Sequence, residues 1–348
     1  MDALETLLRQ GQHVGDDVLL ALLMPSAHPG ERGMDGLHQR AREVTRERFG
    51  RRIYLRALIE WSNVCRNDCY YCGIRKSNRA LRRYTLGRED ILAACENAYA
   101  LGLRTFVLQG GENPAAALQL APVVAEMRAS WPDSAITLSL GELPYETYAL
   151  LRRSGADRYL LRHETASPAH YARLHPAGMR LESRLATLRA LKELGFQTGM
   201  GMMVGSPYQR PQDLVADLRL LTAFRPEMVG IGPFIPQENT PFSDFPPGDA
   251  ATVLRLYSIV RLLLPDALIP CTTALSTLLP EGRMAGLEAG ANVLMPVFTP
   301  SACRADYALY DGKDRPGRAC AENLAALKEE LSAAGYEVLP ERGDFTKH

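Results

Sequence analysis

Residues 61–73 read WSNVCRNDCYYCG, and the rest of the chain is interpreted around this stretch. It places Cys65, Cys69 and Cys72 in one short loop with the spacing C-x3-C-x2-C. Three thiolates at this spacing can hold three irons of a [4Fe–4S] cluster, which normally takes four protein ligands. The fourth iron then keeps an open position, and open metal positions are where substrate chemistry takes place.

The alternative for the same three cysteines is a structural zinc site. Structural zinc is usually closed by four Cys or His ligands. No fourth ligand follows at zinc-finger spacing, because the next cysteine is Cys95, which lies in a helical pattern. The sequence therefore favours an open iron–sulfur cluster over zinc.

The composition is that of a globular protein without a strong electrostatic preference. The chain has 348 residues, 46% of them hydrophobic, and its 40 basic residues balance 40 acidic ones. A net charge of zero gives no reason to expect nucleic acid or an anionic membrane as a partner. The chain has no apolar run of membrane-helix length and no signal peptide pattern at its start, so we expect a cytoplasmic protein. Seven cysteines, an odd number, argue against a secreted disulfide framework.

The chain divides into two predicted units, residues 1–48 and residues 49–348. In the first unit, leucines recur at steps of three and four residues, which predicts a helical cap that packs on the main domain and seals its interior. In the second unit, short apolar strands alternate with helices. The predicted strands are residues 53–61, 105–109, 135–140, 158–161, 197–204, 228–231, 268–272 and 292–296.

Eight strands that are each followed by a helix are typical of an α/β fold, the (βα)8 TIM barrel. The alternative is an open doubly wound sheet. The loop between the first strand and its helix contains no Gly-x-Gly-x-x-Gly, which removes the main reason to prefer a Rossmann domain. We therefore predict a TIM barrel with an N-terminal helical cap and a C-terminal helix over residues 320–334.

In a TIM barrel the reaction takes place at the C-terminal ends of the strands. The second predicted strand runs into Gly110, Gly111 and Glu112. The glycines would let the backbone approach a ligand, and the carboxylate could accept a hydrogen bond from an ammonium group. The fourth strand ends in Arg162 and Glu164. Buried charges need partners, which a zwitterionic ligand would supply; an internal Arg–Glu pair is the alternative.

Further polar side chains follow other strands. Arg184, at the start of a helix, is a candidate for binding a ligand carboxylate, because a guanidinium pairs with a carboxylate through two hydrogen bonds. Thr137 and Ser139 share one face of the third strand by period-two alternation. Thr272 and Thr273 follow the seventh strand, and their hydroxyls and amides could bind an anion.

The cysteine spacing, with Tyr71 just before the last cysteine, resembles the signature of the radical S-adenosylmethionine (SAM) enzymes. This resemblance implies one [4Fe–4S] cluster on Cys65, Cys69 and Cys72, whose open iron chelates SAM. It also implies reductive cleavage of SAM to a 5′-deoxyadenosyl radical. Tyr71 would lie near the adenine, and the GGE stretch would bind the amino group of SAM.

A larger part of the chain resembles the HydE family of [FeFe]-hydrogenase maturases, which is similar to biotin synthase. The stretches that carry the resemblance are SNVCRNDCYYCG, RYLLRHETASP, MVGIGPFIPQENTPF, CTTA and AGANVLMP. It implies that the radical acts on a cysteine-bound Fe(CO)2(CN) synthon during assembly of the H-cluster. The implied SAM contacts are Tyr71, Gly110, Gly111, Glu112, Arg162, Glu164 and Arg184. The implied cavity residues are Thr137, Ser139, Thr272, Thr273 and Tyr307.

The resemblance also implies partners: two sister maturases and an electron donor, either flavodoxin or ferredoxin. Some members of the family carry a second cluster on C-terminal cysteines. Because this chain has only Cys303 and Cys320 in that region, we expect a single cluster. Three alternatives remain open: a methylornithine synthase, a biotin synthase, and an iron–sulfur carrier or scaffold that is not an enzyme. Biotin synthase would need a second cluster inside the barrel, for which only Cys271 is suitably placed.

Overall fold

The computed structural model describes residues 2–24, 33–313 and 324–347. Its main sheet contains six parallel strands paired in chain order. These strands are β2 (Ala57–Ser62), β3 (Thr105–Gly110), β4 (Ala135–Ser139), β5 (Arg158–Leu160), β6 (Gln197–Val204) and β7 (Met228–Pro233). All six coincide with predicted strands, to within a few residues at their ends.

Further parallel pairing closes this sheet into a barrel. Residues 268–271 bridge β7 on one side and β8 (Val293–Leu294) on the other. β8 pairs with β1 (Tyr54–Leu55), and Val297 bridges Leu58 in β2. The predicted seventh and eighth strands therefore take their places in the ring, and the TIM barrel is confirmed.

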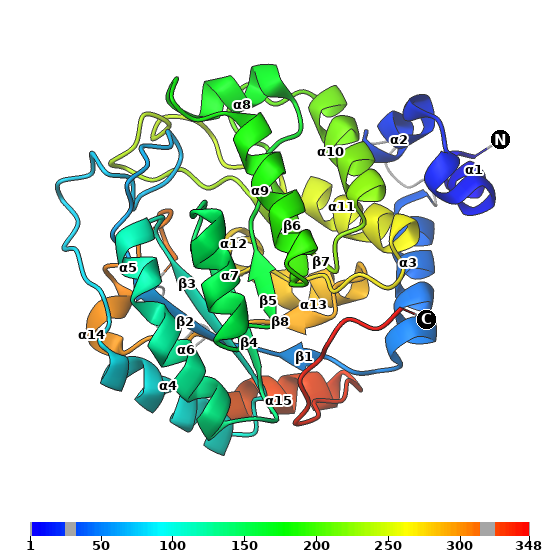
Figure 1. Ribbon diagram of the computed structural model, residues 1–348. Helices are drawn as coiled ribbons and strands as arrows, with labels where there is room; N and C mark the ends of the chain where they lie inside the picture. The colour runs from blue at the N-terminus through cyan, green and yellow to red at the C-terminus, as the bar shows by residue number, and fades with distance from the viewer. Residues whose placement is uncertain (1, 25–32, 314–323, 348) are drawn as a thin grey trace.

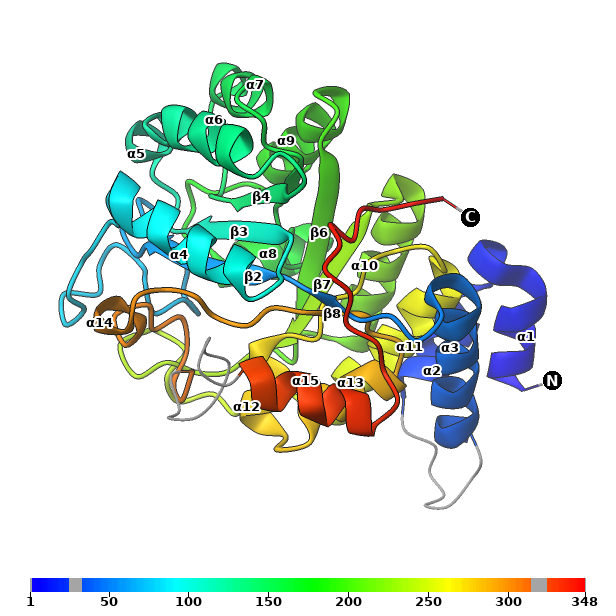
Figure 2. The same cartoon turned by 90° about the horizontal axis from the view of Figure 1, so that it is seen from below.

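Helices cover the outside of the barrel, as Figures 1 and 2 show. They are α4 (Arg88–Ala100), α5 (Pro114–Leu118), α6 (Leu120–Ser130), α7 (Tyr145–Arg153), α8 (Pro168–Leu174), α9 (Leu181–Glu193), α10 (Pro211–Phe224), α11 (Ala250–Leu263), α12 (Thr273–Leu278), α13 (Gly282–Glu288), α14 (Ser301–Arg304) and α15 (Leu324–Ala333). No helix among the residues described here is long and apolar enough to cross a membrane.

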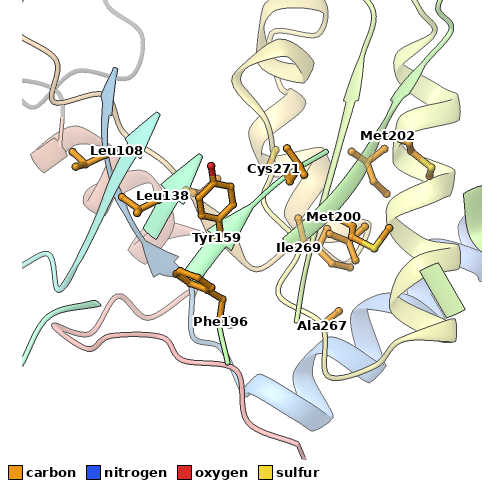
Figure 3. Close-up of a cluster of buried hydrophobic side chains, with 14 of the residues drawn as sticks. Leu108, Leu138, Tyr159, Phe196, Met200, Met202, Ala267, Ile269 and Cys271 are labelled. Carbon is orange, nitrogen blue, oxygen red and sulfur yellow. The ribbon is translucent and has the colours of Figure 1, made fainter. Parts of the chain in front are cut away.

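The apolar core lies between the barrel and these helices (Figure 3). Leu108 of β3 and Leu138 of β4 are fully buried in it. Tyr159 of β5 packs edge-on against Phe196, with ring centroids 5.8 Å apart. Cys95 is also fully buried, in α4, which agrees with its place in a helical pattern.

The N-terminal helices α1 (Ala3–Gln10), α2 (Asp16–Leu23) and α3 (Gly33–Phe49) pack on α10, α11 and α13, on the flank of the barrel (Figure 1). Ala41 of α3 is fully buried, and His38 Nδ1 lies 2.7 Å from Ser258 Oγ of α11. No described residue of this segment lines the pocket at the C-terminal ends of the strands. The expectation that these helices seal the barrel interior is therefore wrong, because their apolar faces are used against the outer helices.

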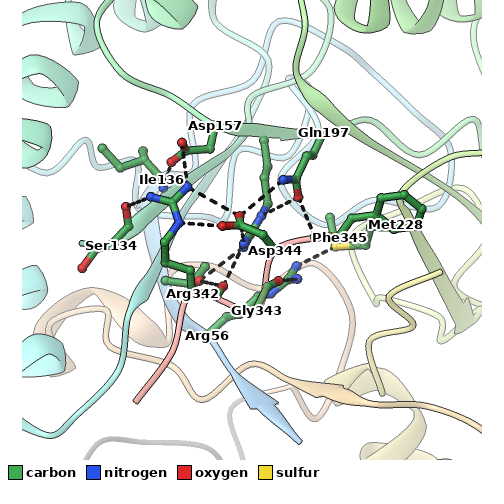
Figure 4. A network of polar contacts seen from close by, with 12 residues as sticks. Arg56, Ser134, Ile136, Asp157, Gln197, Met228, Arg342, Gly343, Asp344 and Phe345 are labelled. Atoms are coloured by element: carbon green, nitrogen blue, oxygen red, sulfur yellow. Dashed lines mark hydrogen bonds and ion pairs between the residues drawn. The ribbon is translucent and has the colours of Figure 1, made fainter. Parts of the chain in front are cut away.

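The C-terminal segment, residues 336–345, lies across the opposite end of the barrel, where the strands begin (Figures 2 and 4). Arg158, the first residue of β5, donates from Nη2 to Asp344 Oδ1 at 2.6 Å. Thr105, the first residue of β3, donates to the carbonyl oxygen of Arg342 at 2.8 Å. This segment therefore forms the floor of the barrel.

Candidate active site

A pocket of about 260 Å³, partly open to solvent, lies at the C-terminal ends of the strands. Most of the side chains predicted for the site line it, although they come from distant parts of the chain. These residues are Cys65, Tyr71, Cys72, Gly110, Gly111, Glu112, Ser139, Arg162, Glu164, Arg184 and Tyr307. Tyr307 lies deep in the pocket wall and is fully buried, and its hydroxyl is 3.4 Å from Gln109 Nε2.

Four predicted residues lie just outside this lining. Cys69 Sγ is 3.9 Å from Met179 Sδ, and Thr137 is buried within β4. Thr272 and Thr273 line a neighbouring small cavity. Thr273 Oγ1 is 2.9 Å from the hydroxyl of Tyr310, which lines the active pocket. The Thr273–Tyr310 pair therefore stands between the two cavities.

Arg83 holds the cysteine loop in shape. Its guanidinium donates to the carbonyl oxygens of Asn63, Ile74, Arg75 and Asn78. Because a guanidinium has five N–H donors in a rigid plane, one side chain can fix several turns of a loop. Nothing in the sequence singles out Arg83, because Arg79 and Arg82 lie close to it in the chain.

Cys65, Cys69 and Cys72 are all free cysteines, so no disulfide removes any of them from metal binding. Burial raises the pKa of the Cys72 thiol to about 12 and also raises that of Cys65. Bound iron would displace these protons, because metals bind the thiolate. Among the described residues, no three Cys, His, Asp or Glu side chains converge on one point as the ligands of a single ion do. In a cubane cluster each cysteine binds a different iron, so its ligands stand farther apart.

Gly110 and Gly111 serve the packing of the cysteine loop. A Cβ on Gly110 would lie 2.2 Å from Trp61 Nε1, and a Cβ on Gly111 would lie 2.8 Å from the Cβ of Cys65. The prediction attributed these glycines to close approach of a ligand. Both do line the pocket, but the contacts that exclude a side chain come from the protein itself.

Glu112 is buried and already has partners. Its Oε1 accepts from Arg66 Nε at 2.8 Å, and its Oε2 accepts from the backbone N–H of Glu142 at 2.6 Å. Arg66 is 54% exposed, so a ligand ammonium group could take its place at little cost. Arg184 is buried nearby, with Nε 3.1 Å from Glu142 Oε1, in a geometry that makes no hydrogen bond.

Arg162 and Glu164 form the internal pair that was kept as the alternative. Arg162 Nη2 donates to Glu164 Oε2 at 2.8 Å. The pairing is incomplete, because the buried Nε of Arg162 has no hydrogen-bond partner among the described residues. Glu164 has φ of +66°, in the left-handed region that non-glycine residues rarely adopt. Such a conformation persists only where surrounding structure enforces it.

A buried His–Asp pair enforces this turn. His163 Nε2 lies 3.0 Å from Asp217 Oδ1, and both side chains are fully buried. The same oxygen accepts from the backbone N–H of Ala166 at 2.5 Å. Asp217, from α10, thereby contacts His163 and Ala166 on either side of Glu164 and stabilises the turn between them. The sequence signal was the polar stretch after β5, but nothing in it indicated a partner on α10.

His175 holds Tyr71 in place. Its Nδ1 is 3.0 Å from the carbonyl oxygen of Tyr171, and its Nε2 is 3.2 Å from the hydroxyl of Tyr71. A carbonyl only accepts, so Nδ1 carries the proton and Nε2 accepts from the tyrosine. Burial lowers the pKa of His175 to about 3, which keeps the ring neutral. This residue was also missed, because it lies in an irregular loop.

The fold and the pocket define a radical SAM enzyme, and residues 59–221 match the profile of the radical SAM superfamily. This class uses SAM and an iron–sulfur cluster. Within it, the chain belongs to the HydE family of [FeFe]-hydrogenase maturases. It is 46% identical over 280 residues to the [FeFe] hydrogenase maturase subunit HydE of Thermotoga maritima, covering 80% of each chain.

Other relatives share the same architecture. The 3-methylornithine synthase of Methanosarcina acetivorans is 28% identical over 334 residues, which cover 95% of this chain and 92% of that protein. A crystal structure of methylornithine synthase superposes with a TM-score of 0.82 at 25% identity, covering 96% of both chains. The HydG maturase of Carboxydothermus hydrogenoformans matches in fold, with a TM-score of 0.79 at 22% identity over 95% of this chain and 77% of that one.

Cys303 lies half-buried in α14. Cys320 lies outside the described residues. The expectation of a single cluster therefore stays a prediction.

Proposed function

We propose that this protein is a radical SAM maturase that cleaves SAM reductively to a 5′-deoxyadenosyl radical and directs it at a cysteine-bound Fe(CO)2(CN) synthon during H-cluster assembly. The observation that carries the proposal is the 46% identity over 80% of both chains to a HydE maturase. The pocket at the strand ends, with Cys65 and Cys72 in its wall, supports the same chemistry.

In this proposal Cys65, Cys69 and Cys72 hold one [4Fe–4S] cluster. When bound, the cluster and SAM together supply a carbon-centred radical of high reactivity. The protein's part is to bind, orient and exclude water. Arg184 pairs with the carboxylate of SAM, while Glu112 exchanges its exposed partner Arg66 for the amino group.

The remaining SAM contacts are held by the buried network around them. Tyr71, oriented by His175, lies by the adenine, and the Gly110–Gly111 backbone forms one wall. Arg162 and Glu164 face the same pocket from the turn that Asp217 ties. Arg162 keeps one N–H without an acceptor among the described residues, which a bound oxygen would satisfy.

Thr137 and Thr272 each carry a buried hydroxyl that has no hydrogen-bond partner among the described residues. Buried hydroxyls are normally satisfied, so such atoms favour a polar ligand nearby. We assign these two threonines, with Ser139, Thr273 and Tyr307, to the cavity that takes the anionic ligands of the synthon.

The proposed partners are the sister maturases and a flavodoxin or ferredoxin, with the iron synthon as a small-molecule substrate. The relative's name, hydrogenase maturase subunit HydE, supports a place among maturases. A reducing compartment such as the cytoplasm suits this role, because it keeps the three thiols available for iron.

The test is anaerobic reconstitution with iron and sulfide, followed by SAM and dithionite. We expect 5′-deoxyadenosine from the wild-type protein and a loss of at least a hundredfold when Cys65, Cys69 or Cys72 is changed to Ser. A hydrogenase-maturation assay with the two sister maturases then tests the substrate. Zinc-only protein, or Cys→Ser variants that still produce deoxyadenosine, would refute the proposal. Iron binding without SAM cleavage would instead indicate a carrier or scaffold.

A second candidate is methylornithine synthase activity. The TM-score of 0.82 and the coverage of 96% of both chains favour it as the alternative. One experiment distinguishes the two functions, because only a methylornithine synthase forms 3-methylornithine when its amino-acid substrate is supplied with SAM and dithionite. Active maturation without that product would exclude this candidate.

A further inference from the structure

The outer face of the cysteine loop carries an aromatic groove that the proposed reaction does not use. This groove is open to solvent and is lined by Tyr70, Arg173, Tyr208, Pro241 and Phe242. The rings of Tyr70 and Phe242 pack edge-on, with centroids 6.0 Å apart. Tyr208 packs in the same way against Phe242, with centroids 6.3 Å apart.

The cysteine loop is the wall between this groove and the active pocket. Tyr70 lines the groove, while its neighbours Tyr71 and Cys72 line the pocket. The backbone N–H of Tyr70 donates to the carbonyl oxygen of Leu174 at 3.0 Å, which fixes the loop against α8. A molecule seated in the aromatic groove is therefore one layer of chain away from the cluster cysteines.

Tyr208 is held at the surface in an unusual conformation. Its φ of +69° lies in the left-handed region, which a bulky side chain rarely takes. The residue is 51% exposed, although its ring is large and apolar. The guanidinium of Arg173 sits 4.5 Å from the ring centroid. Tyrosine and arginine dominate the binding energy of many protein interfaces, so this pair is the kind of anchor that a partner uses.

Charge gives the groove a preference among partners. Arg173 of α8 lines the groove, and Lys76 and Arg79 are exposed in the segment that follows the cysteine loop. None of the three has an ion pair with a residue that the structure describes. Two nearby acids are paired, Asp68 with Arg75 and Asp213 with Arg210, while Asp244, between Phe242 and Phe245, is exposed and accepts from Ser243.

We propose that the aromatic groove docks a small acidic protein that carries one electron. The proposal rests on the proposed function, because reductive cleavage of SAM consumes one electron in each turnover. The carrier loses one electron and the cluster gains it, with no atom transferred. Redox encounters use small interfaces, and complementary charge speeds them. A groove on the cysteine loop whose lining includes the exposed cation Arg173 meets both requirements.

The test measures binding of an acidic flavodoxin to the reconstituted protein by calorimetry at low and high ionic strength. Arg173→Glu reverses the central charge. Tyr208→Gly removes the ring while suiting the left-handed backbone, so it keeps the fold. The matched control is Arg153→Glu, which reverses an exposed charge at the end of α7, where the strands begin.

We expect Arg173→Glu and Tyr208→Gly to raise the Kd about tenfold each, while Arg153→Glu leaves it unchanged. Arg173→Glu should also reduce the dependence of binding on salt. Deoxyadenosine formation driven by dithionite should stay at the wild-type level in all three variants, because dithionite needs no docking site. Wild-type flavodoxin affinity in both groove variants would overturn the proposal. A wild-type protein that is inactive with dithionite would contradict the proposed function instead. The Kd values would still show whether flavodoxin binds at the aromatic groove.

Discussion

His175 lies between two tyrosines in the wall of the site. Its ring stacks on Tyr171 with centroids 4.0 Å apart and meets Tyr71 edge-on with centroids 5.5 Å apart. Only the neutral ring fits this environment, because the one acceptor facing Nδ1 is a carbonyl and the group facing Nε2 is a hydroxyl. Arg184, a buried cation, also disfavours a charged ring.

A pH dependence of stability follows from this residue. The pKa of His175 is lowered from 6.5 to about 3, so below pH 6.5 the unfolded chain binds a proton that the folded chain does not. The stabilisation that neutral His175 gives the folded protein is fully present above the unfolded pKa of 6.5 and is lost as the pH falls below it. Between pH 6.5 and about pH 5.5, the wild type should lose about 1 kcal/mol more than His175→Gln. Urea unfolding at both pH values measures this, and parallel losses in the two proteins would contradict it.

Asp217 is predicted to act as a positioning residue. Asp217→Ala leaves His163 and the N–H of Ala166 without their acceptor, so the free energy of unfolding should fall by about 3 kcal/mol. Asp217→Asn keeps an acceptor oxygen and should lose about 1 kcal/mol. If the turn presents Glu164 to SAM, the KM for SAM should rise in Asp217→Ala more than kcat falls. Equal stability and KM in both variants would argue against this role.

At the scale of elements, α3 is more closely joined to the barrel than α1 and α2. Thr45 donates to the carbonyl oxygen of Gly290 at 3.5 Å, and Leu37 and Ala41 are buried. The first two helices touch the rest of the fold through α10, α11 and α3. We retain residues 1–48 as the proposed N-terminal unit and residues 49–348 as the barrel unit.

Two truncations test this division. Removing residues 1–24 should leave a folded barrel, because α3 continues to cover α11. Removing residues 1–48 should destabilise the protein strongly, since the buried face of α11 would be exposed to water. Thermal unfolding of both proteins checks the prediction. If the protein lacking residues 1–48 unfolds at the wild-type temperature, the first unit does not contribute to the stability of the barrel.

The floor of the barrel depends on one carboxylate. Asp344 pairs with Arg158, whose side chain is only 2% exposed. Figure 4 shows Asp344 beside Arg342, whose Nε donates to it at 2.6 Å. Asp344→Ala would leave a buried guanidinium without its charge partner, so we expect a loss of about 2 kcal/mol in urea unfolding. Asp133→Ala, which removes an exposed partner of Arg104, is the control and should cost under about 1 kcal/mol. Equal effects would mean that the floor is held by its backbone contacts alone.

For the whole molecule, the iron content is the decisive number. The loop at residues 65–72 offers three thiols, and Cys303 stands apart from it in α14. We expect about four irons per chain after anaerobic reconstitution, and the same number in Cys303→Ser. A Cys72→Ser variant should lose most of this iron. Six or eight irons in the wild type, reduced to four by Cys303→Ser, would reveal a second cluster.

Much of the architecture was predictable because its signals are local. Strand and helix periodicity is visible within ten or fifteen residues, and β6 was predicted over residues 197–204, the bounds that the structure has. α5 ends and α6 begins at Gln119, a boundary that neither glycine nor proline marks in the sequence. The cysteine spacing is equally local, since its three thiols belong to one loop.

The sequence by itself determined the order of strands and helices, the cysteine loop after the first strand, and the polar side chains at the strand ends. Only the tertiary structure decided how the ring closes through residues 268–271, that the N-terminal helices lie on the flank, and that the C-terminal segment forms the floor. It also selected Asp217, His175 and Arg83 as supports of the site. Contacts such as Arg158 with Asp344 join residues far apart in the chain, and their energy depends on burial that no short stretch of sequence encodes.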